Sequence, residues 1–155
     1  RGDRMDFSIQ KSTELGVTRI QPLMTERTEV RLSGQRLQRR LDHWQGVAIS
    51  AAEQCGRVKV PDIAPPVTLA DLILDNGLNL VMDPLAERTP RDLTRPDTGV
   101  FSVIVGPEGG FSPSEIERLN QQGVSAISLG ERILRTETAG PAMLTILQTR
   151  FGDWA

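Results

Sequence analysis

Two short segments of this chain combine glycines with charged side chains, and the first could form a ligand-binding loop. It reads Gly106-Pro107-Glu108-Gly109-Gly110-Phe111, and it lies between an apolar run and a helix-like segment. In open α/β sheets, ligands bind beyond the carboxyl ends of strands. Glycines let a ligand approach the backbone, and amides at a helix N-terminus can bind an anion such as a carboxylate. We interpret the segment as a ligand loop, although a tight turn would use the same glycines.

The second segment also lies between an apolar run and a helix-like stretch. It reads Leu129-Gly130-Glu131-Arg132-Ile133-Leu134-Arg135-Thr136-Glu137-Thr138-Ala139. Arg132, Arg135 and Glu137 form a dense charged group, while Ile133 and Leu134 could line an apolar slot for an adenine. The alternative is structural: Arg135 and Glu137 would pair on the surface, and a threonine would cap the helix.

Several other kinds of site are excluded by residue type. Glu108 would repel a phosphate, and the chain has neither a Gly-Lys-Ser/Thr ending nor a Gly-x-Gly-x-x-Gly motif. The single histidine, His43, has no second histidine with which to build a metal site or a nucleophilic triad. The single cysteine, Cys55, can form no internal disulfide. Metal catalysis and Ser-His-Asp hydrolysis are therefore disfavoured, and we expect no metal.

Composition predicts one globular domain that acts in the cytoplasm. The 155 residues are 38% hydrophobic and 25% charged, and no run approaches the roughly 20 apolar residues of a membrane helix. A net charge of -2 is unlike that of a dedicated nucleic-acid-binding module. One segment is nevertheless basic, because Arg27, Arg31, Arg36, Arg39 and Arg40 are opposed only by Glu29. This segment could attract RNA or could simply be a solvated helix surface.

Apolar periodicity predicts an α/β fold with a parallel sheet flanked by helices. Helices are expected at 3–15, 35–55, 68–74 and 138–151, and another is expected to begin after the N-cap Ser112, with Glu115 as its capping partner. Strands are expected at 19–24, 58–63, 78–82, 100–105 and 126–129. Pro141 should fall in the first turn of the last helix. The two candidate ligand loops would follow adjacent strands, so they could share one ligand.

Four motifs together resemble the RsmE family of ribosomal RNA uridine N3-methyltransferases. They are Lys11-x-x-Glu14-Leu15-Gly16-Val17, Ala51-Ala52-Glu53-Gln54 with Arg57, and the two segments that begin at Gly106 and Leu129. The resemblance runs through almost the whole chain. The pairing of the last two motifs, some twenty residues apart, is much more specific than either motif alone.

The resemblance implies a SPOUT methyltransferase fold, in which the C-terminal segment forms a trefoil knot, and a homodimer whose active sites draw on both subunits. It implies S-adenosylmethionine as cofactor and small-subunit (16S) ribosomal RNA as substrate. The donor-binding residues would be Val81, Met82, Asp83, Pro84, Gly106, Pro107, Glu108, Gly109, Gly110, Leu129, Gly130, Ile133, Leu134, Thr138 and Ala139. The family also carries an N-terminal RNA-binding domain, which we expect to be missing before Arg1.

Methylation at N3 of a uridine requires removal of one imide proton, so the site needs a base or a positive charge that stabilises the uridine anion. Glu108 or Glu137 could accept the proton, and Arg132 or Arg135 could stabilise the oxygen charge; the sequence does not rank them. The expected RNA-phosphate contacts are Arg31, Arg36, Arg39 and Arg57. Two other hypotheses remain: a non-catalytic RNA-binding module that keeps the knot, and an α/β enzyme that binds a small ligand such as a nucleotide.

Overall fold

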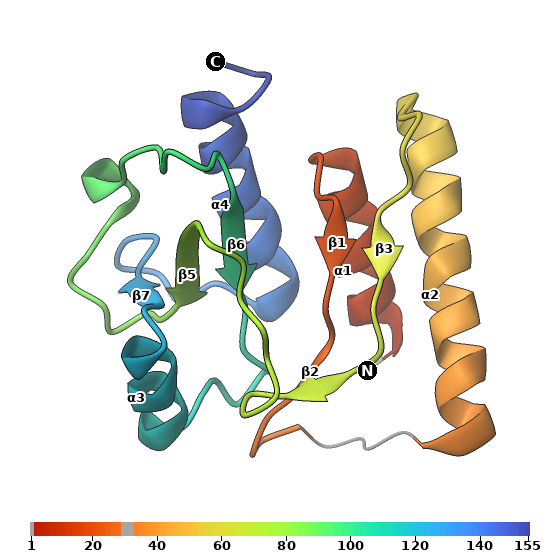
Figure 1. Ribbon diagram of the computed structural model, residues 1–155, viewed down its shortest axis with the longest axis horizontal. Coiled ribbons are helices and arrows are strands. Elements are labelled where there is room, and N and C mark those ends of the chain that lie inside the picture. Colours follow the sequence, from red (N-terminus) through yellow and green to blue (C-terminus); the bar gives the residue numbers. More distant parts are fainter. Residues whose placement is uncertain (1, 29–32) are drawn as a thin grey trace.

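The computed structural model describes residues 2–28 and 33–155, and within them it shows a small α/β fold (Figure 1). The elements in chain order are α1 (Gly2–Glu14), β1 (Arg19–Ile20), β2 (Leu23–Met24), α2 (Gly34–Cys55), β3 (Asp62–Ile63), β4 (Val67–Thr68), β5 (Leu78–Met82), the 3-10 helix η1 (Pro90–Asp92), β6 (Phe101–Ile104), α3 (Pro113–Gln121), β7 (Ser125–Ile127) and α4 (Thr136–Phe151). All strand pairs are parallel. The predicted fold class is therefore confirmed at the level of parallel strands flanked by helices.

The C-terminal half is a three-stranded sheet in the order β6-β5-β7. Successive residues of the central strand point to opposite faces, as a strand requires. Leu80 packs in one core cluster with Met143 and Leu147 of α4. Val81 packs in a second cluster with Leu119 of α3. Both side chains are fully buried, so the sheet is covered on both faces.

The strand order corrects one prediction. The strands that precede the two candidate ligand loops, β6 and β7, are not hydrogen-bonded neighbours, because β5 lies between them. All three strands are parallel, so their carboxyl ends still meet at one edge. The loop after β5 is thereby placed between the two predicted ligand loops.

Prolines divide the strands of the N-terminal half. The predicted strand 19–24 is two short strands, β1 and β2, separated by Gln21 and Pro22. They pair with β3 and β4, which are separated by Ala64, Pro65 and Pro66. Proline has no N–H to donate to a ladder. The ladder therefore breaks between the two pairs, although Val67 still donates to the carbonyl of Pro22 at 3.1 Å.

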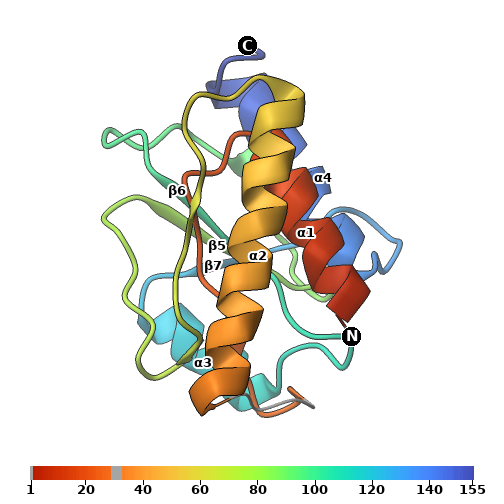
Figure 2. The ribbon, with the colours of Figure 1, turned by 90° about the vertical axis from the view of Figure 1, so that its right-hand side faces the viewer.

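Helix α1 lies between α2 and α4 in both ribbon views (Figures 1 and 2). Ile9 of α1 forms a buried cluster with Trp44 and Ala48 of α2 and Ile63 of β3. Gly16 ends α1 as predicted, with a φ of +92° that favours glycine. The carbonyl before it, that of Leu15, accepts a hydrogen bond from Gln148 of α4 at 2.8 Å. These contacts join the two halves of the chain.

Two further predictions are wrong in detail. Residues 68–74 do not form a helix: Thr68 and Asp71 make a single turn, in which the Asp71 N–H donates to the Thr68 carbonyl at 3.1 Å. Leu72 and Leu74, two residues apart, then pack against the cluster around Val81, which suits an irregular extended path.

Helix α4 begins at Thr136, so Pro141 lies in its second turn. Because proline has no N–H, the Glu137 carbonyl receives no helical hydrogen bond.

The capping box predicted at Ser112 is present. The Ser112 hydroxyl accepts from the Glu115 N–H at 3.2 Å, and the Glu115 carboxylate accepts from the Ser112 N–H at 2.8 Å.

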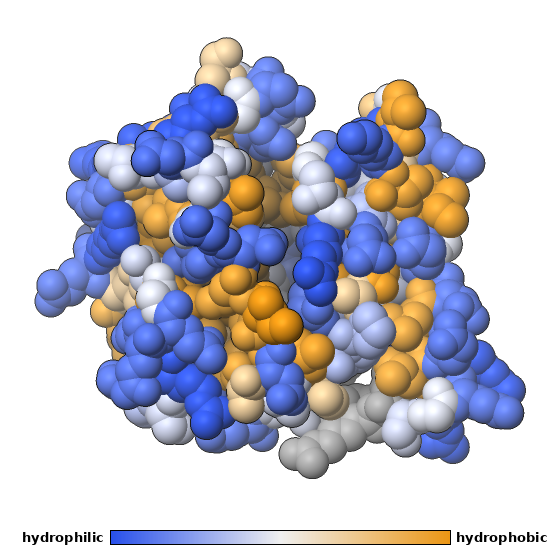
Figure 3. Space-filling model, in the orientation of Figure 1, coloured by the Kyte–Doolittle hydropathy of each residue, from blue (hydrophilic) through white to orange (hydrophobic). Residues whose placement is uncertain are grey.

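Among the residues that the structure describes, no helix is long and apolar enough to cross a membrane. On the face shown in Figure 3, hydrophobic side chains gather in separate patches between hydrophilic ones.

Candidate functional site

A cleft of about 650 Å³ lies at the carboxyl ends of β5, β6 and β7. This is the edge at which ligands bind in open α/β sheets, because the loops that follow parallel strands converge there. Residues from the three loops line it, together with one residue of α1 and parts of α3 and α4. The lining comprises Arg4, Met82, Asp83, Pro84, Leu85, Val105, Gly106, Pro107, Glu108, Gly109, Gly110, Phe111, Ile116, Ile127, Ser128, Leu129, Arg132, Ile133, Leu134, Arg135, Thr136 and Ala139.

The glycine-rich loop after β6 is a tight turn that opens α3. The Gly110 N–H donates to the Pro107 carbonyl at 2.8 Å, and Gly110 has a φ of +67°. That conformation strains most other residues, so a glycine is needed there. The two interpretations that the sequence allowed are thus compatible, because the segment is a tight turn and also lines the cleft.

Two contacts fasten this loop from outside the sheet. The Thr136 hydroxyl donates to the Gly106 carbonyl at 3.1 Å, which links the loop to the first residue of α4. An Arg27 Nη donates to the Gly109 carbonyl, and a side chain on Gly109 would crowd the Arg27 chain, whose Cδ lies 3.2 Å from the position of a Cβ. The loop is therefore held between the start of α4 and the segment that follows β2.

The loop after β7 offers free backbone groups to a ligand. Within residues 2–28 and 33–155, no hydrogen bond involves a backbone N–H or carbonyl of residues 129–134. Gly130 has a φ of +94°, which turns the chain away from β7. Leu129 and Leu134 are half-buried, whereas Ile133 is 81% exposed at the cleft. Because backbone polar groups need partners, this loop can supply both donors and acceptors beside an apolar wall.

Charged side chains from two loops and one helix surround the cleft. Arg132 and Arg135 line it and are exposed, and they come from the loop after β7. Glu108 lines it from the glycine-rich loop, and Arg4 lines it from the first turn of α1. An Arg4 Nη forms an ion pair with Glu108. The alternative of an Arg135–Glu137 surface pair is not what the structure has, since Glu137 faces Arg4, with 3.9 Å between Oε1 and Nε.

Most of the predicted donor-binding residues meet at this cleft, and a few do not. Twelve line it: Met82, Asp83, Pro84, Gly106, Pro107, Glu108, Gly109, Gly110, Leu129, Ile133, Leu134 and Ala139. Val81 is buried in the core beneath the cleft, and Gly130 and Thr138 are exposed but lie outside the lining. Of the four predicted catalytic residues, Glu108, Arg132 and Arg135 line the cleft and Glu137 does not.

Sequence reasoning missed several residues of the lining. Leu85, Val105, Ile127 and Ser128 flank the predicted segments, so wider segment bounds would have included them. Phe111 and Thr136 lie inside the two motifs but were not assigned to the donor site, and Ile116 lies further along the chain, in α3. Arg4 carried no such signal, because it lies about 80 residues or more from the loops and reaches the cleft only through the packing of α1 against α4.

The predicted RNA contacts are dispersed. Arg36 and Arg39 are exposed near the start of α2, and Arg31 lies outside the described residues. Arg57 is half-buried, and its Nη1 donates to the carbonyls of Thr13 at 2.7 Å and Val17 at 2.8 Å. These bonds close the C-terminal end of α1 against α2. They give Arg57 a structural task in this conformation.

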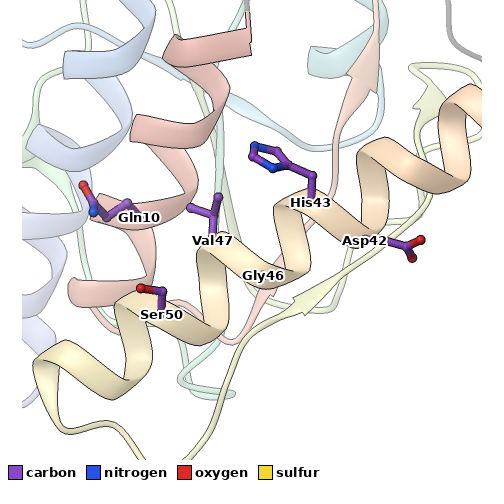
Figure 4. Close-up of a pocket in the computed structure, with 6 residues that line it drawn as sticks. All are labelled: Gln10, Asp42, His43, Gly46, Val47 and Ser50. Atoms are coloured by element: carbon purple, nitrogen blue, oxygen red, sulfur yellow. The ribbon is translucent and has the colours of Figure 1, made fainter.

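A second hollow, of about 420 Å³, lies between α1 and α2 (Figure 4). It is lined by Gln10, Asp42, His43, Gly46, Val47 and Ser50. His43 Nε2 lies 2.7 Å from Oδ2 of Asp6 on α1. None of the four sequence motifs contributes a residue to this hollow.

Comparison with known proteins gives a consistent result. The model of the RNA methyltransferase domain family matches residues 1–148. The ribosomal RNA small subunit methyltransferase E of Buchnera aphidicola subsp. Schizaphis graminum is 40% identical over 99% of this chain and 63% of its own length. The protein of the same name from Aquifex aeolicus is 34% identical over 92% of this chain and 62% of its own length.

Solved structures agree with the sequence relatives. A crystal structure of the Neisseria gonorrhoeae ribosomal RNA small subunit methyltransferase E bound to S-adenosylmethionine is 41% identical, with a TM-score of 0.92 over all of this chain and 64% of its own. A methyltransferase from Legionella pneumophila in complex with S-adenosylmethionine is 40% identical, with a TM-score of 0.89 over 96% of this chain and 62% of its own. The chain thus spans less than two thirds of the length of these relatives. It belongs to the RNA methyltransferase domain family and, within it, to the RsmE family of ribosomal RNA small subunit methyltransferases.

Proposed function

We propose that this domain binds S-adenosylmethionine in the cleft and transfers its methyl group to N3 of a uridine in small-subunit (16S) ribosomal RNA. The observation that carries the proposal is the convergence of both family motifs, those beginning at Gly106 and Leu129, on one cleft. The volume of about 650 Å³ is that of a small-molecule site. Further support comes from the Neisseria and Legionella structures, both of which contain S-adenosylmethionine.

The lining suits the chemistry of this donor. Leu129, Ile133 and Leu134 provide apolar surface for an adenine ring, and the free backbone groups of residues 129–134 provide hydrogen bonds to its polar edge. The N–H groups of Glu108 and Gly109, in the loop just before α3, are not used by the turn and lie where a carboxylate can bind. S-adenosylmethionine supplies a methyl group that its sulfonium charge already activates. The protein therefore needs to hold the uridine in line and to manage one proton.

Among the two candidate acids, Glu108 is the better acceptor for the N3 proton. It lines the cleft, whereas Glu137 does not. Arg132 and Arg135 line the same cleft, so either guanidinium can stabilise the negative charge that develops on the uridine oxygens. We propose Arg36 and Arg39, both exposed on α2, as phosphate contacts. Arg31, which lies outside the described residues, is proposed as a third. A ribosomal RNA substrate would place the protein in the cytoplasm.

The trefoil knot is proposed from contacts around the connection between β5 and β6. The Ser128 N–H donates to the Arg88 carbonyl and an Arg88 Nη donates to Ser125, both at 2.9 Å. Arg150 of α4 donates to the carbonyl of Leu93 at 3.1 Å. The connection thus contacts the chain both before and after the loop at 129–134, as a threaded loop does. A homodimer is part of the same proposal, and its support is the resemblance to the family.

The first test is calorimetric titration of the chain with S-adenosylmethionine, with S-adenosylhomocysteine and ATP as comparators. We expect saturable binding of both adenosyl amino acids and none of ATP, because the cleft carries no phosphate-binding motif. A folded sample that binds neither adenosyl amino acid contradicts the donor site and favours a non-catalytic RNA-binding module. Binding of ATP alone favours an enzyme that acts on a nucleotide.

The second test identifies the product. Small-subunit ribosomal RNA is incubated with the protein and isotopically labelled S-adenosylmethionine, digested to nucleosides and analysed by mass spectrometry. We expect label in N3-methyluridine. Label in another nucleoside would refute the N3 assignment and leave methyl transfer intact.

A further inference from the structure

Arg4 lies between two carboxylates, one from a loop and one from a helix. One Nη forms an ion pair with Glu108 of the glycine-rich loop, and Nε lies 3.9 Å from Oε1 of Glu137 in the first turn of α4. Arg4 itself belongs to the first turn of α1. One guanidinium therefore connects three elements that are distant in sequence, and it does so at the cleft.

The two carboxylates differ in their surroundings. The Glu108 side chain is 58% exposed, so water solvates it whether or not Arg4 is present. The Glu137 side chain is 18% exposed, and among the described residues its Oε2 is buried with no hydrogen-bond partner. A partly buried carboxylate needs a nearby positive charge, and Arg4 is the cation that the described residues place beside it. Glu137 thus has the stronger need for Arg4.

We infer that Arg4 is a positioning residue, anchored by Glu137, that holds Glu108 and with it the glycine-rich loop at the cleft. The planar guanidinium can engage two carboxylates in different directions at once, which a lysine ammonium does less well. The inference also assigns Glu137, which does not line the cleft, an indirect role through Arg4. Its catalytic part rests on the proposed function, whereas its structural part does not.

The structural part is tested without donor or RNA, by hydrogen–deuterium exchange of the Arg4→Met variant. We expect faster exchange in peptides that cover residues 106–111, because their anchor to α1 is lost and only the contacts of Thr136 and Arg27 still hold the loop. The control is Lys11→Met, which removes a positive charge from the same helix; Lys11 pairs with Glu14 at 2.8 Å and does not line the cleft. Equal exchange at residues 106–111 in the two variants would overturn the inference.

The catalytic part is tested with a double-mutant cycle of Arg4→Met and Glu108→Gln. We expect Arg4→Met to lower kcat by roughly 10- to 100-fold, as small misplacements in active sites do, and to weaken donor binding by a smaller factor. Arg4→Lys should recover part of the loss. If Arg4 acts through Glu108, then Arg4→Met should lower kcat no further in the Glu108→Gln background.

The outcomes separate this inference from the proposed function. Independent, multiplicative losses in the cycle would show that Arg4 acts directly on RNA or donor, and would overturn its positioning role. A wild-type chain that transfers no methyl group to RNA would contradict the proposed function. In that case the exchange experiment still decides whether Arg4 holds the loop.

Discussion

Two solvent-facing hollows in the described part of the chain share a general feature. The cleft at the sheet edge has a volume of about 650 Å³, and the groove between α1 and α2 has a volume of about 420 Å³. Each has a carboxylate paired with a basic side chain nearby: Glu108 with Arg4 in the first and Asp6 with His43 in the second. Concavity and charge therefore do not distinguish them.

The backbone distinguishes them. All six residues that line the groove belong to α1 or α2, where the backbone N–H and carbonyl groups serve the helical ladder. The cleft is lined largely by loops, and residues 129–134 have free backbone groups within the described chain. Adenosyl groups are recognised by hydrogen bonds in fixed positions together with apolar contact. Unpaired backbone beside apolar side chains therefore distinguishes the proposed ligand site from the groove, whereas a paired carboxylate does not.

The largest expected effect comes from Arg135→Ala in the cleft. Loss of a positive charge that stabilises the uridine anion should lower kcat by about 100-fold, with a smaller change in donor affinity. The matched control is Arg118→Ala, on the exposed face of α3 outside the cleft, which should leave both unchanged. Steady-state methyl transfer and calorimetry measure the two quantities. A large loss of donor affinity with normal turnover would contradict this role for Arg135.

Gly106→Ala should have the next largest effect. A Cβ there would lie 3.0 and 3.1 Å from ring carbons of Phe111, which also lines the cleft, so the ring must shift. Because the cleft wall moves, we expect donor affinity to fall by about tenfold, equivalent to about 1.4 kcal/mol. Calorimetric titration measures the change. Unaltered affinity would mean that the donor does not contact this wall.

The features that the sequence predicted well depend on neighbours in the chain. Strand β5 has the expected bounds, 78–82, because four of its five residues are apolar. The capping box of α3 joins Ser112 to Glu115, three residues on, so its signal is local. Both candidate loops were found for the same reason, since each combines glycines with charge in a single short segment.

The features that the sequence did not predict depend on packing between distant segments. The order β6-β5-β7 follows from how the connections cross, and Arg4 reaches the cleft only because α1 packs against α4. The Thr68 turn has the N-terminal signature of a helix, but the leucines that follow it pack against the sheet core instead. The hydrogen bonds of Arg57 to the carbonyls of Thr13 and Val17 were not predicted either, because these partners are distant from Arg57 in sequence.

Gly46→Ala makes in the groove the same glycine-to-alanine change that Gly106→Ala makes in the cleft, and it tests whether the groove binds the donor. Gly46 lies inside α2, and a Cβ there would meet nothing within 4 Å. Alanine in a helix interior should therefore raise the free energy of unfolding by about 0.5–1 kcal/mol, because the unfolded chain loses freedom. Urea unfolding measures this change, and donor affinity should remain that of the wild type. Weaker donor binding would mean that the groove, too, belongs to the ligand site.

The smallest effect is expected from His43→Gln, which removes the basic member of the groove pair. The His43 side chain is 50% exposed and that of Asp6 is 29% exposed, and pairs of this kind contribute less than about 1 kcal/mol. Figure 4 shows Val47 between His43 and Ser50 along α2, so the hydroxyl is not placed as a nucleophile beside the imidazole. We therefore expect normal methyl transfer and a small change in urea unfolding. Loss of transfer in a stably folded variant would show that the His43–Asp6 pair takes part in the chemistry. Free backbone groups would then no longer distinguish the proposed site from the groove.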